Sequence, residues 1–375
     1  MPRRSVAFSS VALCLLAGSL AGPPAAAANT ASGPATYTYV NLGWLGSLPV
    51  GRPWSEAWDV NAARQVVGSG SNTVNPAGHA FTWQNGQLTA LPAIYAPGEN
   101  VAASINDAGD VAGHTHVNRT DPPHAFIRRN GSTIDLGTGW GSGSGSAAKA
   151  INNQGVVVGT RFQYQGGPVR AVLWSASGRL RDLGTLGGSS DRPWSTESEA
   201  HAVNDKGQVV GTALARSGPA LHGFLWEDGR MTDLGSLGGT TEATVARGIN
   251  EKTQITGSSQ NAAGEIHAFM WDLGVMRDLG VLPGGTSSFA YDINESGHVV
   301  GTSRTSADYY GAHAFVWEGE RMVDLNTVVT NLPSDVALEH AFAINDDGVI
   351  VGSTCYYCEP GKTADQHAYM LIPNG

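Results

Sequence analysis

The chain has 375 residues, of which 50 are Gly and 18 are Pro, and only 14 % are charged. Exposed helix faces need Lys, Glu and Arg and few glycines, so this composition excludes a helical bundle, while 41 % hydrophobic residues argue against a disordered chain. The formal net charge of −10 argues against nucleic acid as a partner, because no basic surplus exists to displace counterions from phosphates.

Residues 1–28 have the pattern of a secretory signal peptide. Arg3 and Arg4 form a basic start, residues 6–20 are apolar, and small residues at 23–28 resemble a cleavage region. The apolar stretch is shorter than the roughly 20 residues that a membrane helix needs. We therefore expect a secreted, extracellular chain exported by the Sec route. A twin-arginine signal and a retained membrane anchor are the alternatives.

Residues 29–36 are expected to form a short linker, and residues 37–375 a single domain. This domain contains an Ala-x-x-Ile/Val-Asn segment seven times, at steps of 44 to 52 residues. A glycine follows each Asn seven residues later. The repeats are centred on Asn61, Asn106, Asn152, Asn204, Asn250, Asn294 and Asn345, and the glycines are Gly68, Gly113, Gly159, Gly211, Gly257, Gly301 and Gly352.

One repeat, read in full, predicts four short strands in two hairpins. Residues 200–204 and 208–212 are extended runs on either side of a turn with a glycine at Gly207. Residues 222–226 and 230–235 form a second pair around Asp228 and Gly229. Four-stranded units at this period are typical of β-propeller blades.

The two ends of the domain are expected to share one blade. The last repeat stops after its third strand, at residues 367–371, and residues 39–46 have the pattern of a fourth strand. The N-terminal strand would then close the ring and leave no open sheet edge between the first and last repeats. We predict an all-β fold, a seven-bladed propeller of four-stranded antiparallel blades; an open β-solenoid would not need a split repeat.

The segments His267-Ala-Phe-Met-Trp271 with Asp278-Leu279-Gly280, and His313-Ala-Phe-Val-Trp317 with Asp324-Leu325, resemble the HAF repeat of bacterial extracellular repeat proteins. The resemblance covers nearly the whole predicted domain. It implies export and a repetitive β-architecture, but no established chemistry. Three repeats depart from the pattern, with Arg170 for the His, Arg128 for the Trp and Ala90 for the Asp.

The repeated His and Asp residues are expected to be structural. A two-residue turn at Asp228-Gly229 would place Phe224 opposite Asp233 and bring His222 diagonally within reach of that carboxylate. Arg170 would replace the His toward Asp182, and His367 would contact Asn41. The structural columns are His79, His124, His222, His267, His313 and His367, and Asp135, Asp182, Asp233, Asp278 and Asp324.

We expect neither a metal nor a cofactor. The histidines belong to different blades, and the oxygen ligands that calcium prefers, such as Asn106, Asp107 and Asp110, are clustered in too few repeats. The repeated Trp residues are expected to pack between blades. Cys355 and Cys358 are predicted to form a local disulfide in an exported chain, with a redox pair and half of a zinc site as alternatives.

The position after each invariant Ala is the one that varies, and we expect its side chains to point into the central mouth. Ordinary packing between blades is the alternative. These residues are Trp58, Ala103, Lys149, His201, Arg247, Tyr291 and Phe342. Trp54 and Trp194, each in an Arg-Pro-Trp segment before a blade, are further ligand-binding candidates. Residues 137–147, rich in Gly and Ser, are expected to be a flexible linker.

Two functions fit these residues. The first is a monomeric, non-catalytic module that binds an extracellular or cell-envelope carbohydrate or protein at the mouth and interblade loops. The alternative is a polysaccharide lyase for acidic glycans. Lys149 and Arg247 would neutralise the substrate carboxylate, and His201 or Tyr291 would move the proton. No nucleophile motif or paired-carboxylate spacing supports the enzyme, so the binding module is favoured.

Overall fold

The computed structural model describes most of the chain beyond the predicted signal region. The described residues are 35–46, 53–71, 78–92, 99–116, 121–141, 143–163, 167–188, 197–216, 220–239, 243–305, 311–354 and 366–375. The predicted signal peptide, the start of the linker, Trp194 and the two cysteines Cys355 and Cys358 lie outside them. The strands all belong to one compact unit, Pro34–Gly375.

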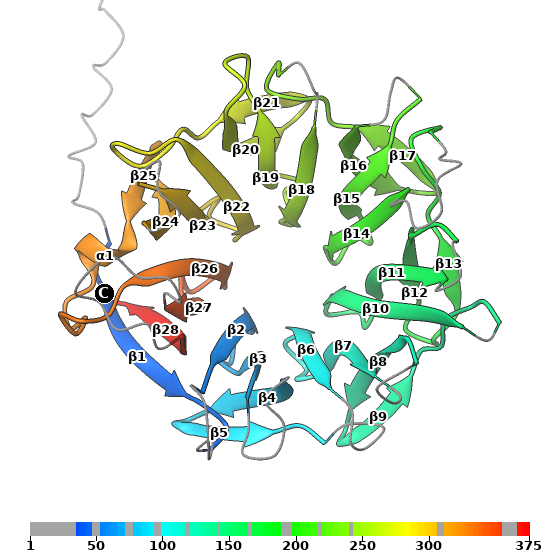
Figure 1. The fold of residues 1–375 in the computed structure, drawn as a ribbon, viewed down its shortest axis with the longest axis horizontal. Coiled ribbons are helices and arrows are strands. Elements are labelled where there is room, and N and C mark those ends of the chain that lie inside the picture. The colour runs from blue at the N-terminus through cyan, green and yellow to red at the C-terminus, as the bar shows by residue number, and fades with distance from the viewer. Residues whose placement is uncertain are drawn as a thin grey trace, which may run out of the picture. The chain divides into compact units, whose positions relative to one another are not determined.

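Within this unit, seven antiparallel sheets of four strands each surround a common centre (Figure 1). Each sheet is one blade, and its first strand lies innermost. Blades 1 to 3 are β2 (Ser55–Val60), β3 (Val66–Gly70), β4 (His79–Gln84) and β5 (Gln87–Ala90); β6 (Asn100–Ile105), β7 (Val111–His116), β8 (Pro123–Arg129) and β9 (Ser132–Asp135); and β10 (Ser144–Ile151), β11 (Val157–Gln163), β12 (Arg170–Trp174) and β13 (Leu180–Asp182).

The remaining blades follow in chain order around the ring. Blades 4 to 6 are β14 (Ser198–Val203), β15 (Val209–Leu214), β16 (Leu221–Glu227) and β17 (Arg230–Asp233); β18 (Thr244–Ile249), β19 (Ile255–Gln260), β20 (Ile266–Asp272) and β21 (Val275–Asp278); and β22 (Ser287–Ile293), β23 (Val299–Arg304), β24 (Ala312–Glu318) and β25 (Arg321–Asp324). A short helix, α1 (Leu325–Val328), which the repeat pattern did not predict, leads to blade 7.

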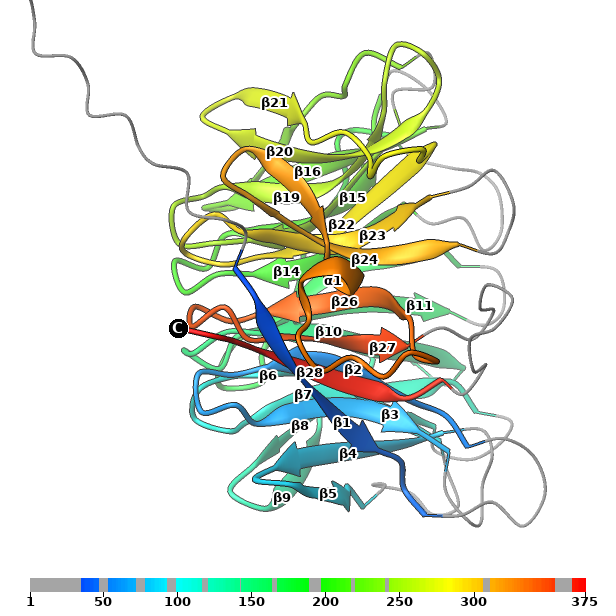
Figure 2. The same ribbon diagram turned by 90° about the vertical axis from the view of Figure 1, so that its left-hand side faces the viewer.

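Blade 7 contains both ends of the propeller and confirms the predicted closure. It consists of β26 (Leu338–Ile344), β27 (Ile350–Thr354) and β28 (Ala368–Pro373), with β1 (Tyr37–Gly43) as its outermost strand. Strand β1 pairs antiparallel with β28, with Tyr39 opposite Leu371. Figure 2 shows β1 crossing beside β28, and near the C-terminus the N–H of Asn374 donates to the carbonyl of Thr36 at 2.8 Å.

The predicted hairpin geometry is also confirmed. Asp228 and Gly229 both have positive φ, 51° and 86°, which is the backbone of the two-residue type I′ turn. The turn places Phe224 opposite Asp233. Among the described residues, no helix has the length and apolar character needed to cross a bilayer.

The core is distributed between neighbouring blades. Trp174 of blade 3 is fully buried and packs with Ala112, Ala125 and Ile127 of blade 2, and its indole N–H donates to the carbonyl of Leu136 at 3.1 Å. Because each sheet buries its apolar side chains against the next sheet, the repeated Trp and Phe columns stabilise the ring. The prediction that the Trp column packs between blades is confirmed for this residue.

The glycine seven residues after each Asn has a steric cause. A β-carbon at any of these glycines would lie 1.8 to 2.0 Å from the carbonyl oxygen of the residue before the invariant Ala. At Gly211 the obstructing oxygen belongs to Glu199, at 1.9 Å. Real β-carbons do not approach an oxygen so closely, so only glycine allows the two inner strands to pair here.

The His–Asp pairs form as predicted in four blades. His222 Nδ1 donates to Asp233 at 2.8 Å, and His124, His267 and His313 contact Asp135, Asp278 and Asp324 at 2.7 to 2.9 Å. Each pair joins the third and fourth strands of one blade. In blade 1, where the Asp is replaced by Ala90, His79 bonds the side chain of Asn100 instead.

Three predictions were wrong, and two of them concern the partners of Arg170 and His367. Arg170 pairs with Glu197 at 2.7 Å, and Asp182 pairs instead with Arg161 at 2.6 Å. Arg161 lies opposite Arg170 on β11, and its side chain is long enough to reach across β12 to Asp182. His367 bonds the Tyr39 hydroxyl at 2.7 Å, whereas the Asn41 side chain accepts from the N–H of Gly43.

The third error concerns the predicted flexible linker at residues 137–147. Strand β10 begins at Ser144, and Thr138 and Ser144 join their hydroxyls at 2.6 Å. The Ser146 hydroxyl donates to the carbonyl of Gly137 at 2.8 Å, and Arg161 covers the Trp140 ring at 4.0 Å. Hydroxyl hydrogen bonds order a segment whose composition suggested flexibility.

Candidate functional site: the central cavity

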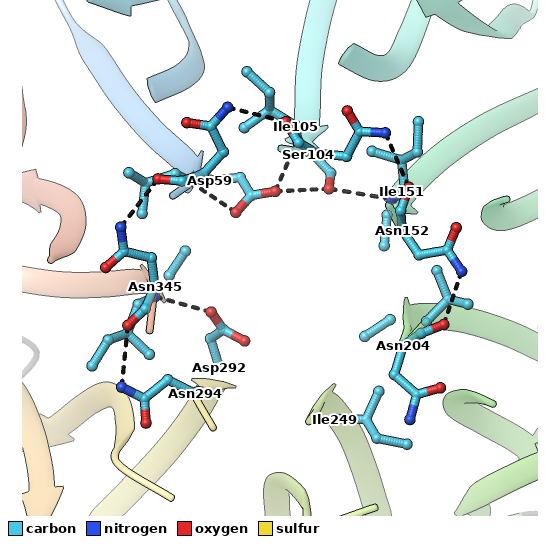
Figure 3. A pocket seen from close by; sticks show the side chains of 18 of the residues that line it. Asp59, Ser104, Ile105, Ile151, Asn152, Asn204, Ile249, Asp292, Asn294 and Asn345 are labelled. Carbon is cyan, nitrogen blue, oxygen red and sulfur yellow. Dashed lines mark hydrogen bonds between the residues drawn. The ribbon is translucent and has the colours of Figure 1, made fainter. Parts of the chain in front are cut away.

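A cavity of about 390 Å³ lies at the centre of the ring, lined by the innermost strands of all seven blades. The seven residues at the variable position all line it, as the sequence predicted. These residues are called the variable ring: Trp58, Ala103, Lys149, His201, Arg247, Tyr291 and Phe342. Figure 3 shows the cavity from close by, with several of the asparagines labelled.

A β-bulge in every innermost strand places these side chains. In blade 4, Ala200 pairs with Gly211 and Ala202 with Val210, so His201 has no partner on the next strand. The same shift occurs at the equivalent position of the other six blades. A bulge re-aims the side chain of the extra residue, and here it directs that side chain into the cavity.

Aromatic side chains form one side of the variable ring. Trp58 of blade 1 and Tyr291 of blade 6 flank Phe342 of blade 7, with ring centroids 4.6 and 5.5 Å from it. His340 stacks on Phe342 at 5.2 Å, and burial lowers the pKa of His340 to about 4. At neutral pH the side chains of Trp58, Tyr291, Phe342 and His340 therefore form an uncharged aromatic cluster.

Charged side chains form the opposite side. Lys149 of blade 3 and Glu199 of blade 4 form an ion pair, and His201 Nε2 lies 3.4 Å from the same carboxylate. The His201 hydrogen bond and the Lys149 charge lower the pKa of Glu199 to about 2. Burial and then Lys149 lower the pKa of His201, whose Nδ1 donates to the carbonyl of Ala246 at 2.7 Å.

Arg247 connects the charged and aromatic sides. Its guanidinium carbon lies 5.5 Å from the centroid of the Tyr291 ring, a cation–π distance. Its Nε atom is buried and has no hydrogen-bond partner among the described residues. Burial raises the pKa of Tyr291, so its phenol stays protonated at neutral pH.

Two buried carboxylates lie one residue further along the inner strands. Asp59 accepts hydrogen bonds from the Ser104 hydroxyl and the Ile105 N–H of the next blade, at 2.7 and 2.9 Å. Asp292 accepts from the N–H of Ile344 of its next blade at 2.9 Å. Burial raises the pKa of Asp59 to about 6 and that of Asp292 to about 7.

The repeated asparagines form a closed ring at the end of the cavity where the inner strands turn. Each Asn donates its side-chain N–H to the backbone carbonyl of the Asn in the next blade, at 2.9 to 3.1 Å, and Asn345 completes the circle onto Asn61. Each side-chain oxygen accepts from the N–H four residues later in its own turn. Figure 3 shows part of this asparagine ring.

The residues after the asparagines make a second, incomplete ring. The side chains of Asp107, Asn153, Asp205, Glu251, Glu295 and Asp346 each accept the backbone N–H of the equivalent residue in the preceding blade, at 2.5 to 2.9 Å. Ala62 offers no acceptor to the N–H of Asp346. These side chains are therefore structural parts of the turn end.

The structure thus brings Lys149, His201, Arg247 and Tyr291 to one cavity. Trp54 precedes β2, and its backbone N–H donates to the Ser71 hydroxyl at 2.9 Å. Trp54 does not line the cavity. Trp194 and the predicted disulfide of Cys355 and Cys358 fall outside the described residues. The His–Asp pairs join the third and fourth strands of their blades, away from the lining residues of the cavity.

Sequence reasoning did not identify the links between blades. Asp59 and Asp292 stand at a position that is Ala, Ser or Gly in the other repeats, and this contrast was a usable signal. Glu199 is another polar residue at a position that is Val, Ala or Phe in four repeats. The asparagine ring could not be read from one repeat, because its hydrogen bonds connect residues 44 to 52 positions apart along six of its seven links.

The sequence matches no protein-family model and no curated protein sequence. Solved structures with a similar fold include a puromycin-hydrolyzing peptidase of Mycobacterium tuberculosis, at 13 % identity and a TM-score of 0.54, covering 86 % of this chain and 53 % of that one. A prolyl endopeptidase is similar at 10 % identity and a TM-score of 0.52, over 86 % of this chain and 45 % of that one.

TolB of Acinetobacter baumannii is also similar, at 10 % identity and a TM-score of 0.43, over 86 % of this chain and 64 % of TolB. The chain thus spans about half to two thirds of the length of these proteins. At such low identity the comparison shows the propeller fold alone.

Proposed function

We propose that the protein is a secreted, non-catalytic binding module whose ligand enters the central cavity and contacts the variable ring. The observation that carries this proposal is the diversity of that ring. Seven blades built on one pattern have seven different side chains, Trp, Ala, Lys, His, Arg, Tyr and Phe, at the position that lines the cavity. A scaffold role would favour one residue type in every blade, as it does for the Asn and Gly columns.

The aromatic side favours a carbohydrate as the ligand. Sugar rings have apolar C–H faces that pack on aromatic rings, and their hydroxyls need polar partners at the edge of the contact. Trp58 and Phe342 provide the aromatic surface, while Lys149, His201 and Arg247 provide the polar groups. Export through residues 1–28 and membership of the HAF-repeat family belong to the same proposal.

The test is glycan binding by the purified protein, measured on an array and then by calorimetry. Trp58→Ala and Phe342→Ala should each weaken binding at least about tenfold, as expected for a buried aromatic contact. Trp140→Ala is the matched control, because Trp140 lies under Arg161 and does not line the cavity. Equal affinity in all three variants would place the binding site elsewhere. Capture of proteins but no glycan would assign a protein partner instead.

A lyase is the second candidate, because Lys149, His201, Arg247 and Tyr291 line one cavity. The ion pair of Lys149 with Glu199 weakens this candidate, since it already neutralises a charge that would have to bind the substrate carboxylate. The test is the ultraviolet absorbance of an unsaturated uronate after incubation with acidic polysaccharides. A signal that disappears in His201→Ala and Tyr291→Phe would overturn the non-catalytic proposal.

A further inference from the structure

The innermost strands direct one backbone N–H from each blade into the cavity. In blade 4 the N–H of Asn204 bonds the carbonyl of Gln208, so the next pair, Val203 and Val209, is a pair without ladder hydrogen bonds. The N–H of Val203 therefore points away from β15 and toward the centre. The equivalent residues of the ring are Val60, Ile105, Ile151, Val203, Ile249, Ile293 and Ile344.

Five of these seven N–H groups are satisfied by side chains. Asp59 accepts from Val60 and Ile105, and Asp292 accepts from Ile293 and Ile344, at 2.8 to 2.9 Å. The Ser104 hydroxyl accepts from Ile151 at 3.2 Å. Figure 3 shows Asp59 and Ser104 reaching toward these neighbours.

The N–H groups of Val203 and Ile249 have no such acceptor. The residues that would supply it from the preceding blade are Ala150 and Ala202, and no other described side chain accepts from either group. Val203 and Ile249 line the cavity, so these two N–H groups are free to bond a group that enters it.

One of the two unmatched N–H groups lies on the same blade as the positive charge of Arg247. Arg247 belongs to blade 5, as Ile249 does, and its buried Nε has no hydrogen-bond partner among the described residues, whereas Glu199 already neutralises Lys149. The buried carboxylates Asp59 and Asp292 belong to blades 1 and 6 and already accept hydrogen bonds with both oxygens.

We propose that blades 4 and 5 bind the carboxylate of an acidic sugar, with the N–H groups of Val203 and Ile249 as donors and Arg247 as the opposite charge. This inference rests on the proposed function and specifies its ligand. Two backbone donors on adjacent blades suit the two oxygens of a carboxylate, as Asp59 already accepts from Val60 and Ile105 of blades 1 and 2. The aromatic surface of Trp58, Tyr291 and Phe342 favours a uronic acid over an acidic peptide.

The test is an amide NMR titration of the isotope-labelled protein with galacturonate, acetate and N-acetylglycine. The Val203 and Ile249 resonances should shift and saturate with galacturonate, and should do so at lower concentration than with the other two compounds. Neutral galactose is the control for the carboxylate. If neither resonance moves with any of the three carboxylates, the inference is wrong. Tighter binding of N-acetylglycine than of galacturonate would overturn the assignment to a sugar.

The decisive variant adds a side chain that itself accepts the hydrogen bond of Ile249. In Ala202→Asp the new carboxylate would reach the N–H of Ile249 as Asp59 reaches Ile105, and we expect at least tenfold weaker galacturonate binding with the fold intact. Ala62→Asp adds the same charge at the turn end, beside the N–H of Asp346, and should bind as the wild type does. Equal weakening in both variants would show that charge alone acts, and would contradict the proposed contact.

The two proposals fail in different ways. If neutral and acidic glycans bind equally and Trp58→Ala weakens both, the carboxylate contact is wrong but the binding module stands. If galacturonate shifts Val203 and Ile249 whereas Trp58→Ala and Phe342→Ala leave every ligand unaffected, the carboxylate contact stands but the aromatic site is wrong.

Discussion

The two ends of the central cavity are built from the same seven strands and differ in what they repeat. At the turn end, seven identical asparagines satisfy one another's backbone around a closed circle. A few residues earlier in each strand, the variable ring has a different side chain in every blade. Symmetry stabilises the ring where the hydrogen bonds are shared, and chemical diversity is found where a bulge frees one residue from pairing. One short cavity thus has a repeated, hydrogen-bonded end and a chemically varied part.

The largest expected effect is a loss of stability from steric clash at the glycines that follow each repeated Asn by seven residues. In Gly211→Ala the new β-carbon would lie 1.9 Å from the carbonyl oxygen of Glu199, and we expect a loss of more than about 4 kcal/mol in the free energy of unfolding. Gly141→Ala, where nothing lies within 4 Å, is the control and should change stability by less than about 0.5 kcal/mol. Urea unfolding measures both, and similar midpoints would contradict the steric account.

The second prediction contrasts the pH dependence of the two regions. Burial raises the pKa of Asp292 to about 7, so its contribution to stability is present near pH 4 and is lost as the pH rises through 7. Asp292→Asn should remove about 4 kcal/mol of this dependence, since the pKa is raised from its ordinary value of 3.8 at roughly 1.4 kcal/mol per pKa unit. Glu199, whose pKa is lowered to about 2, has the opposite sign: its contribution is lost as the pH falls below its ordinary value. Thermal unfolding across this range would refute the contrast if Asp292→Asn and Glu199→Gln changed the profile in the same direction.

The third prediction separates the asparagine ring from the variable ring. Asn204→Ala removes the donor to the Asn250 carbonyl and the acceptor for the Gln208 N–H, and should cost about 2 kcal/mol because both groups are buried. Lys149→Met breaks a partly exposed ion pair and should cost less than about 1 kcal/mol. Denaturant midpoints of the two variants measure the difference. An equal loss in both would mean that the variable ring is as structural as the asparagines.

The smallest expected effect concerns the second ring of hydrogen bonds at the turn end, which lacks an acceptor at Ala62. Ala62→Asn would offer the missing acceptor to the N–H of Asp346, as Asn153 does for Asp107 at 2.9 Å. We expect a gain of about 0.5 to 1 kcal/mol, the usual net value of one hydrogen bond. Calorimetric melting of Ala62→Asn against Ala62→Val measures it. A variant no more stable than Ala62→Val would show that water already satisfies this N–H.

Much of the fold could be predicted because each repeat contains the turns and strand spacings that define one blade. The fixed spacing from Asn204 to Gly211 indicates a hairpin, and the turn at Asp228-Gly229 sets the register that brings His222 to Asp233. These contacts are local, so one repeat contains all the residues involved. Where another residue replaced the expected partner, as Arg161 replaced Arg170 at Asp182 and Tyr39 replaced Asn41 at His367, the prediction was wrong.

The sequence by itself determined the number of blades, the four strands of each, the shared seventh blade and the position whose side chains line the cavity, because period, turn chemistry and alternation are local properties. Only the tertiary structure decided how that cavity is divided. It placed the aromatic residues of blades 1, 6 and 7 opposite the charged residues of blades 3 to 5, and it left the N–H groups of Val203 and Ile249 without a partner. These contacts depend on which blades become neighbours when the ring closes, and no single repeat contains that information.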